Sequence, residues 1–230
     1  MNIIIAGATG DIGKAITISI SQHLPEAKLL LLYRDQEKKA LLSKQLSPSN
    51  TQFLCIQHPF QNKDIIFNTF LKFQPQIFIC AIGDGFYAKV ENVDLEELDK
   101  SYEANFKIPF FLAQLAYKIF LPQKKGHIIF INSISALEGF PYGSLYCPFK
   151  FALKGAAEVM AKEGKRYGLK VSSIYPGIVK TKLLDKMPFV PKKGLLNPED
   201  VAQAVLYLLK LSPYAEVKDL LLKNNNLAWR

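Results

Sequence analysis

The sequence predicts an α/β fold in which a doubly wound, seven-stranded, mostly parallel sheet carries helices on both faces. Short apolar runs of strand length alternate along the chain with longer runs whose apolar residues recur at helical spacing. The first run, 2–6, is rich in β-branched residues, which is typical of a strand buried on both faces of a parallel sheet. The chain shows no linker, repeat or shift of composition, so residues 1–230 are expected to form a single domain.

The elements follow one another in strict alternation. Strands are expected at 2–6, 28–33, 52–56, 76–82, 127–132, 170–175 and 217–222. Helices are expected at 11–24, where apolar residues stand at 12, 16 and 20, and at 35–46, 64–73, 95–121, 145–167 and 198–211. The 95–121 run reads as one helix or two, and Pro198 suits the first turn of the last helix. The only long irregular stretch, about 181–197, is either a substrate loop or a plain loop.

Composition and charge exclude several classes of protein. The net charge is +9, but the lysines are scattered, which favours a solvated surface over a nucleic-acid or membrane-binding patch. No apolar run approaches the ~20 residues of a membrane span. Three separated cysteines and three histidines without metal-ligand spacing predict a reduced, cytoplasmic protein with no metal site.

A glycine-rich turn joins the first strand to the first helix. Two residues separate Gly7 from Gly10 and Gly10 from Gly13, and the free dihedrals of glycine permit a tight turn and a close approach to a pyrophosphate. The N–H groups of the following helix offer donors to phosphate. This context favours a Rossmann-like dinucleotide site, whereas a plain tight turn is the alternative.

Arg34 and Asp35 follow the second strand. An acidic residue there usually binds the ribose of NAD, and an arginine suits the 2′-phosphate of NADP. Asp35 either caps the next helix or reaches the ribose. The pair favours NADP as cofactor, with NAD possible.

These motifs and those downstream resemble the single-domain short-chain dehydrogenase/reductases over nearly the whole chain. Tyr146 and Lys150 match the family's Tyr-x3-Lys pair, Ser133 stands thirteen residues before Tyr146, and Asn105 matches the helix Asn. Residues 175–181 and 197–202 match two further segments. The chain departs from the family at 80–83, at 57–59 and at 223–226. The resemblance and the glycine turn together imply cofactor contacts at Gly7, Thr9, Gly10, Asp11, Ile12, Gly13, Arg34, Gly83, Tyr146, Lys150, Pro176, Gly177, Val179 and Thr181.

The chemistry of these residue types suits transfer of a hydride and a proton between a carbonyl and an alcohol. Tyr146 and Lys150 are four residues apart on a helix and share a face, so the lysine cation is expected to lower the tyrosine pKa. Ser133 is expected to hydrogen-bond the carbonyl oxygen. Phe140, Leu183, Leu184 and Met187 line an apolar substrate pocket or pack in the core. Tyr142 is more consistent with a pocket wall than with a second acid.

The sequence also leaves open an alternative function and predicts an oligomeric assembly. A non-catalytic NADP-binding redox sensor is the alternative function, and the chain is too short for sugar-nucleotide epimerisation. The family's dimer helices correspond to 106–120 and the helix that holds Gly155, which predicts a homodimer or homotetramer. Pro109 cannot donate to the carbonyl of Asn105, so a local kink is expected there, and we hypothesise that the freed carbonyl holds a water beside Lys150. The alternative is that Pro109 merely starts a second helix segment.

Overall fold

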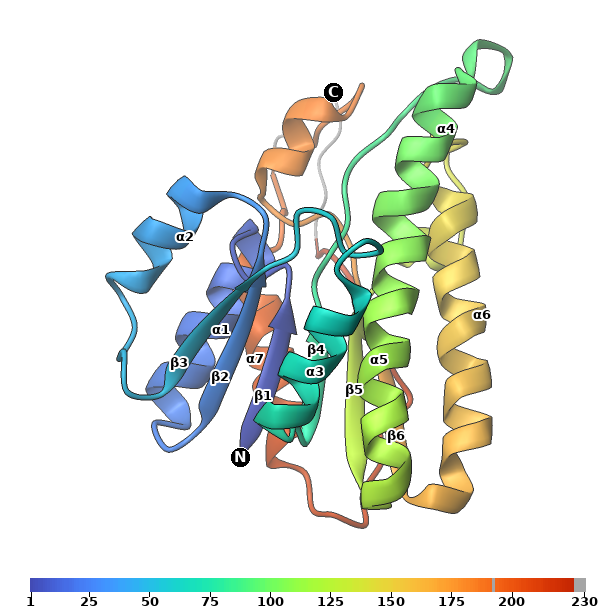
Figure 1. Ribbon diagram of the computed structural model, residues 1–230. Coiled ribbons are helices and arrows are strands. Elements are labelled where there is room, and N and C mark those ends of the chain that lie inside the picture. Colours follow the sequence, from blue (N-terminus) through green and yellow to red (C-terminus); the bar gives the residue numbers. More distant parts are fainter. Residues whose placement is uncertain (192, 226–230) are drawn as a thin grey trace.

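The computed structural model of the chain places seven strands in one sheet of order β3-β2-β1-β4-β5-β6-β7 (Figure 1). It describes residues 1–191 and 193–225. The strands are β1 (Asn2–Ala6), β2 (Lys28–Tyr33), β3 (Thr51–Cys55), β4 (Ile77–Cys80), β5 (Gly126–Ile131), β6 (Leu169–Pro176) and β7 (Asp219–Leu222). All six strand pairings are parallel, so the fold class expected from the sequence is confirmed.

Within the described residues, seven α-helices surround the sheet, with helices on both of its faces (Figure 1). They are α1 (Asp11–His23), α2 (Gln36–Ser43), α3 (Lys63–Phe73), α4 (Leu95–Tyr102), α5 (Ile108–Gln123), α6 (Cys147–Gly164) and α7 (Pro198–Lys210). The described residues also contain four short 3₁₀ turns, which are η1 (Val90–Asn92), η3 (Ile134–Ala136), η4 (Lys165–Tyr167) and η5 (Lys182–Lys186). The helices connect strands whose carboxyl ends meet at one edge, and the candidate site lies along that edge.

Successive side chains of the strands point alternately into two separate hydrophobic cores. Ile4, Leu30 and Phe78 belong to the core shared with α3, α5 and α6. Ile3 and Ile5, on the opposite face of β1, belong to the core shared with α1 and α7. Since both faces of β1 are buried, its sequence shows no polar alternation, as the parallel-sheet interpretation requires.

Several element ends differ from those expected. β4 stops at Cys80 rather than at 82, because its neighbour β1 ends at Ala6 and the chain turns away at Gly7. β7 begins at Asp219 rather than at 217, and α6 begins after Tyr146, which forms its N-cap. α2 is shorter than 35–46, because Asp35 caps it and residues 44–46 form tighter turns.

The 95–121 run forms one helical column with an irregular middle. Between α4 and α5 lies a π turn, Glu103–Lys107 (η2), in which Ile108 N–H donates to the Glu103 carbonyl. Pro109 stands in the first turn of α5, where its missing N–H is tolerated. The irregularity expected near Pro109 takes the form of a wider turn before α5, and the place of Pro109 agrees with the alternative that it starts a second helix segment.

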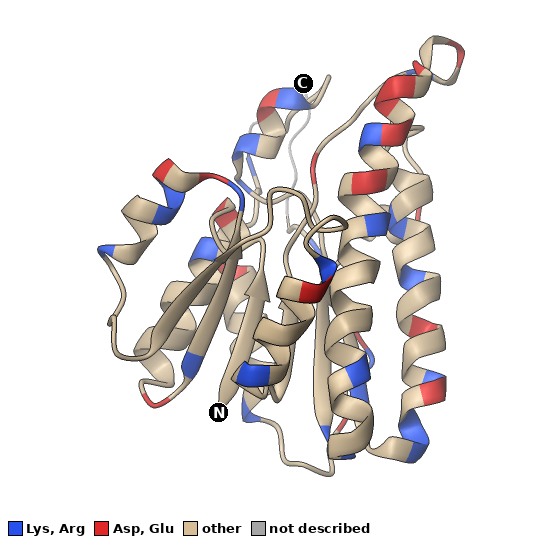
Figure 2. Ribbon diagram, viewed as in Figure 1, with Lys and Arg blue, Asp and Glu red and all other residues tan. Residues whose placement is uncertain are grey.

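Charged residues are distributed over the molecule rather than gathered on one face. In the view of Figure 2, basic and acidic segments alternate along the helices. Within residues 1–191 and 193–225, no helix is long and apolar enough to cross a membrane. The same residues contain no group of three or more His, Cys, Asp or Glu side chains placed to hold a metal ion.

Candidate active site

The glycine turn packs too tightly for side chains at two of its positions. Gly7 has φ +80°, and a Cβ there would lie 2.8 Å from the Ala81 carbonyl oxygen. A Cβ on Gly13 would lie 2.1 Å from the Gly7 oxygen. Gly10 forms the N-cap of α1 with no side-chain cap. The first turn of α1 therefore presents backbone N–H groups at the edge of the sheet, as a phosphate group requires.

Asp11, for which a cofactor contact is predicted, also forms a hydrogen bond between two loops. Its carboxylate accepts a hydrogen bond from the backbone N–H of Lys182, at 2.8 Å. The glycine turn is thereby joined to η5, at the start of the irregular 181–197 segment. The structure shows Asp11 as a contact between these two loops, while Ile12 lines the cavity described below.

The structure assigns Asp35 to helix capping. Its carboxylate accepts from the Lys38 backbone N–H at 3.0 Å and pairs with the Lys38 ammonium at 3.6 Å. These contacts, led by the backbone hydrogen bond, lower the pKa of Asp35. Arg34 is exposed beside it at the end of β2. Of the two roles open to Asp35, capping is the one that the hydrogen bonds support.

Asn105 and Gly83 meet at the base of the site, although they are 22 positions apart. Asn105 is fully buried on the π turn, and its side chain donates to the Asp84 carbonyl at 2.9 Å and accepts from the Asp84 N–H at 3.1 Å. A Cβ on Gly83 would lie 3.1 Å from the Lys150 ammonium nitrogen and 3.2 Å from Asn105 Oδ1. Gly83 therefore leaves the space in which Asn105 and Lys150 approach each other.

Tyr146 and Lys150 are both almost completely buried, at 8% and 2% exposure. The Lys150 ammonium lies 5.4 Å from the centre of the Tyr146 ring, which confirms that the two side chains share one side of the helix start. Burial raises the pKa of Tyr146, and the neighbouring Ser133 hydroxyl offsets only part of the rise. Burial lowers the pKa of Lys150 to about 8. The pKa of Tyr146 is therefore raised and not lowered as expected, because burial is the largest cause of its shift and Lys150 is not among the groups that lower it.

Ser133 stands at the end of β5 and caps η3. Its hydroxyl oxygen accepts from the Ser135 N–H at 3.1 Å and its proton points to Ser135 Oγ at 3.0 Å. The next residue back, Asn132, donates to the Lys150 carbonyl at 3.3 Å. β5 therefore fixes both the serine and the start of α6, from which Lys150 projects.

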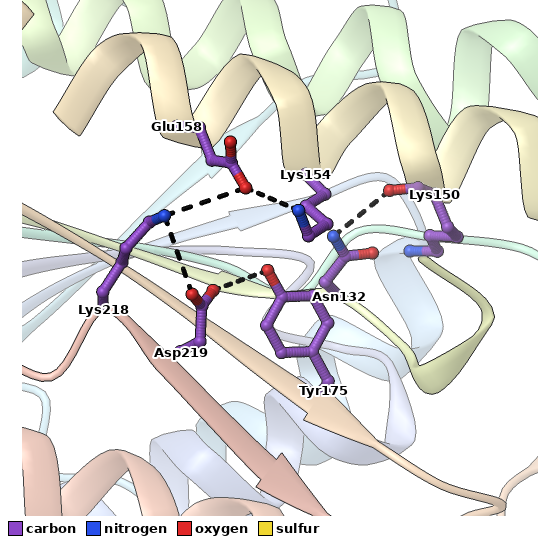
Figure 3. A network of polar contacts seen from close by, with 7 residues as sticks. All are labelled: Asn132, Lys150, Lys154, Glu158, Tyr175, Lys218 and Asp219. Atoms are coloured by element: carbon purple, nitrogen blue, oxygen red, sulfur yellow. Dashed lines mark hydrogen bonds and ion pairs between the residues drawn. The ribbon is translucent and has the colours of Figure 1, made fainter. Parts of the chain in front are cut away.

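A polar network fixes the end of β6 beside α6 (Figure 3). The Tyr175 hydroxyl donates to Asp219 at 2.8 Å, and Lys218 lies 3.8 Å from both Asp219 and Glu158. Lys154 completes the chain of contacts with an ion pair to Glu158 at 2.5 Å. The network joins β7 to α6, so the turn after Tyr175 has a fixed position.

That turn, which begins at Pro176–Gly177, is held by a residue that the sequence analysis missed. The Asn224 side chain accepts from the Ile178 N–H at 2.7 Å and donates to the carbonyls of Ile178 and Gly194, both at 2.8 Å. A Cβ on Gly177 would lie 2.0 Å from Asn224 Oδ1. In the sequence, residues 223–226 stand out only as a departure from the family pattern, and Asn226 lies outside the described residues. The signal that could have identified Asn224 is its type, since an amide both donates and accepts.

These loops surround one cavity of about 540 Å³. Its lining includes Ser133, Tyr146, Lys150, Gly83 and the 176–179 turn, together with Thr181. The expected pocket residues Phe140, Leu183, Leu184 and Met187 also line it. Tyr142 lies outside the lining and packs its ring against Phe189 at 5.5 Å. The structure thus brings most of the predicted site residues to one cavity, although they are far apart in the sequence. Asn105 lies outside the lining and supports it through the 83–84 segment, and Arg34 lies on the loop between β2 and α2.

The structure combines a parallel sheet, a glycine turn and a Tyr-Lys pair beside a cavity. These features are typical of oxidoreductases that use a dinucleotide. The family model described as short chain dehydrogenase matches residues 1–188. The chain therefore belongs to the short-chain dehydrogenase family.

Individual relatives agree with this family. An uncharacterized oxidoreductase of Staphylococcus aureus is 30% identical over 223 residues, which covers 94% of each chain. Sepiapterin reductase of Chlorobaculum tepidum is 28% identical over 141 residues, covering 61% of this chain and 58% of the relative. Among solved structures, an alcohol dehydrogenase of the archaeon Thermococcus sibiricus complexed with 5-hydroxy-NADP has a TM-score of 0.82 at 23% identity, covering 97% of this chain and 96% of its own. The closed form of serine dehydrogenase complexed with NADP+ has a TM-score of 0.83 at 19% identity, covering 96% and 94%.

Proposed function

We propose that this chain is an NADP-dependent oxidoreductase that interconverts a carbonyl and an alcohol, with Tyr146 as the general acid and base. The observation that carries the proposal is the placement of Tyr146, Lys150 and Ser133 on one cavity whose remaining walls are largely apolar. A reduced nicotinamide, when bound, supplies the hydride. The similarity to NADP-bound structures supports the choice of cofactor.

The residues present fit a dinucleotide. The close approach of Gly13 to Gly7 and the uncapped start of α1 leave backbone donors for a pyrophosphate. Asp35 is engaged as a helix cap, so the exposed Arg34 fork remains for a 2′-phosphate. The turn at Pro176, Gly177 and Val179 would hold the nicotinamide, and Lys150 would hold its ribose.

Each side chain of the site has a distinct task in reduction. Burial keeps Tyr146 as a neutral phenol, so that its hydroxyl has a proton to give to the carbonyl oxygen. Ser133 hydrogen-bonds the same oxygen and stabilises the charge that develops on it. Asn105 positions Lys150 through the segment at Gly83, and Lys150 supplies positive charge next to the phenol. The 181–197 segment would cover the substrate.

The test is oxidation of NADPH in the presence of a panel of ketones and aldehydes. Turnover with at least one carbonyl compound, accompanied by formation of its alcohol, is the expected result. Tight NADPH binding with no oxidation by any member of the panel would instead support a non-catalytic NADP-binding protein. The same panel with NADH measures the preference between the two cofactors.

A further inference from the structure

The substrate end of the cavity has almost no charge. Among the lining residues that the structure describes, Lys150 is the only Lys, Arg, Asp or Glu, and its ammonium lies 5.4 Å from the centre of the Tyr146 ring. Beyond Ser133 and Tyr146 the wall is formed by Tyr87, Phe140, Leu183, Met187 and Phe189. A carboxylate or ammonium next to these aromatic and aliphatic side chains would lose its hydration without gaining an oppositely charged partner among them. The cavity therefore suits an uncharged compound.

Aromatic rings lead outward from the proton donor in a short series. The Tyr87 ring lies 5.8 Å from that of Tyr146 and 6.1 Å from that of Phe140, and both pairs are tilted by 47°. These separations and tilts are those that aromatic pairs favour. Tyr87 stands in the middle, so it contacts the proton donor on one side and the outer wall on the other.

Gly85 makes room for the Tyr87 ring. A Cβ at position 85 would lie 2.9 Å from Tyr87 Cε2 and 3.1 Å from Leu183 Cγ. The glycine therefore allows the aromatic ring and the leucine from η5 to approach each other over a bare stretch of backbone. Burial raises the pKa of Tyr87, which keeps its hydroxyl neutral.

Two contacts outside the lining attach η5, and one of them engages a charged side chain. The Lys186 ammonium pairs with the Asp84 carboxylate at 2.6 Å and lies 5.4 Å from the centre of the Phe86 ring. The Lys182 backbone N–H is bonded to Asp11. These two contacts hold η5 beside the cavity, and its leucines form part of the lining. The attachment of this segment therefore contributes to the apolar character of the pocket.

We infer that the substrate is an uncharged aryl ketone or aldehyde whose ring packs against Tyr87 and Phe140. This inference rests on the proposed function for its carbonyl chemistry. The carbonyl carbon gains a hydride from the reduced nicotinamide and the oxygen gains the Tyr146 proton, which gives the alcohol and the oxidised cofactor. Tyr146 then regains a proton from solvent. Tyr87 acts as a specificity-determining residue and takes no part in the proton transfer.

Binding of two ketones that differ only in ring type tests the inference. Dissociation constants of acetophenone and cyclohexyl methyl ketone are measured by ligand-observed NMR, with and without NADP. Acetophenone is expected to bind about 5-fold more tightly. Tyr87→Leu, which removes the ring, should bring the ratio close to one, whereas Tyr87→Phe should retain it. Benzoylformate, an aryl keto acid, should bind much more weakly than acetophenone.

The outcomes separate this inference from the proposed function. Equal affinities for both ketones, an unchanged ratio in Tyr87→Leu, or preferential binding of benzoylformate would overturn the inference even if carbonyl reduction is observed. Selective aryl binding without any NADPH oxidation would count against the proposed reaction and support the binding preference. Circular dichroism verifies folding, and Phe140→Leu serves as the second variant if Tyr87→Leu does not fold. The ratio of kcat/KM values for the two ketones, compared between wild type and variant, provides an independent check because intrinsic reactivity cancels.

Discussion

Tyr146 and Lys150 illustrate how burial sets the properties of individual side chains. Their spacing of four residues brings them together, but their pKa values move in opposite directions, each toward the neutral form. A neutral phenol is the form needed to protonate a carbonyl oxygen. Substitution of a single side chain therefore gives the sharpest test of the proposed reaction.

Replacement of Tyr146 by Phe should lower turnover by at least about 100-fold, because the ring remains but the transferable proton is lost. Steady-state NADPH oxidation measures the effect, and the dissociation constant for NADPH should change little. Tyr142→Phe is the matched control, since Tyr142 lies outside the cavity lining. Near-normal turnover in Tyr146→Phe would end the assignment of this residue as the acid.

Arg34→Asp should shift the cofactor preference toward NAD. The substitution removes a planar fork that suits a 2′-phosphate and adds a repulsive charge. Dissociation constants for NADPH and NADH, measured by fluorescence titration, give the preference. Arg166→Asp makes the same change in net charge beside the Tyr167 ring, so it serves as control for long-range electrostatics. An equal loss of NADPH affinity in both variants would contradict a specific role for Arg34.

At the scale of secondary-structure elements, loops are fixed by residues that come from other strands. Asn224 follows β7, yet it bonds to Ile178 after β6 and to Gly194 near the end of the 181–197 segment. Two backbone hydrogen bonds join the same two parts of the chain: the Lys180 N–H donates to the Leu196 carbonyl, and the Leu196 N–H donates to the Ile178 carbonyl. The residues on both sides of the 181–193 stretch are thus held together at one base.

Asn224→Ala should weaken binding of cofactor and substrate, because three hydrogen bonds to the base of the segment are lost. A loss of about 3-fold to 30-fold in kcat/KM corresponds to the usual net value of one or two buried hydrogen bonds. Asn225→Ala, at the neighbouring exposed position, is the control. Unchanged kinetics in a folded Asn224→Ala protein would show that the 177–194 contacts do not position the site.

The β5–β6 pair carries a group whose titration should affect folding. His127 Nε2 lies 2.8 Å from Ser172 Oγ, and the serine hydroxyl donates to the Val217 carbonyl, so the neutral ring donates to the serine. Burial, with Lys170 across the ladder, lowers the pKa of His127 to about 4. Between the ordinary value near 6.5 and the lowered value, the unfolded chain binds a proton that the folded chain does not.

The free energy of unfolding should therefore fall as the pH decreases from 6.5 toward 4. At pH 5 this histidine alone should contribute a loss of about 2 kcal/mol relative to neutral pH. Urea denaturation of wild type and His127→Gln at both pH values measures the difference, and contributions from the carboxylates cancel in the comparison. A parallel pH dependence of the two proteins would contradict the assignment.

At the scale of the whole molecule, α5 and α6 form the outer layer on one side of the sheet (Figure 1). Much of the apolar surface of α5 is buried within the chain, against the sheet and its neighbouring helices. Apolar side chains that remain exposed on the same side include Tyr102, Phe151 and Val159. Gly155 lies among them with open space in front of its Cα. We expect this surface to pack against the same helices of a second copy.

A homodimer, or a dimer of dimers, is the expected assembly. Gly155→Arg places a long charged side chain where close approach of two helices is needed, so it should shift the protein toward the monomer. Light scattering at micromolar concentration measures the mass. Ala40→Arg on α2, which lies in another part of the molecule, should leave the mass unchanged. A wild-type protein of monomeric mass would refute the prediction.

The sequence by itself determined the alternation of strands and helices, the glycine turn and the spacing of Ser133, Tyr146 and Lys150. These features are local, because hydrophobic period, backbone freedom at glycine and separation along a helix depend on near neighbours in the chain. The parallel sheet follows from them, since strands separated by helices cannot pair as hairpins.

Only the tertiary structure decided the electrostatics of the site and the residues that hold it in place. Asp84 meets Asn105 across 21 positions, and Asn224 meets Ile178 across 46. The pKa shifts of Tyr146 and Lys150 arise from burial that no local pattern encodes. Contacts between distant residues and the removal of water exist only after the chain has folded, which is the physical reason that they escaped the sequence analysis.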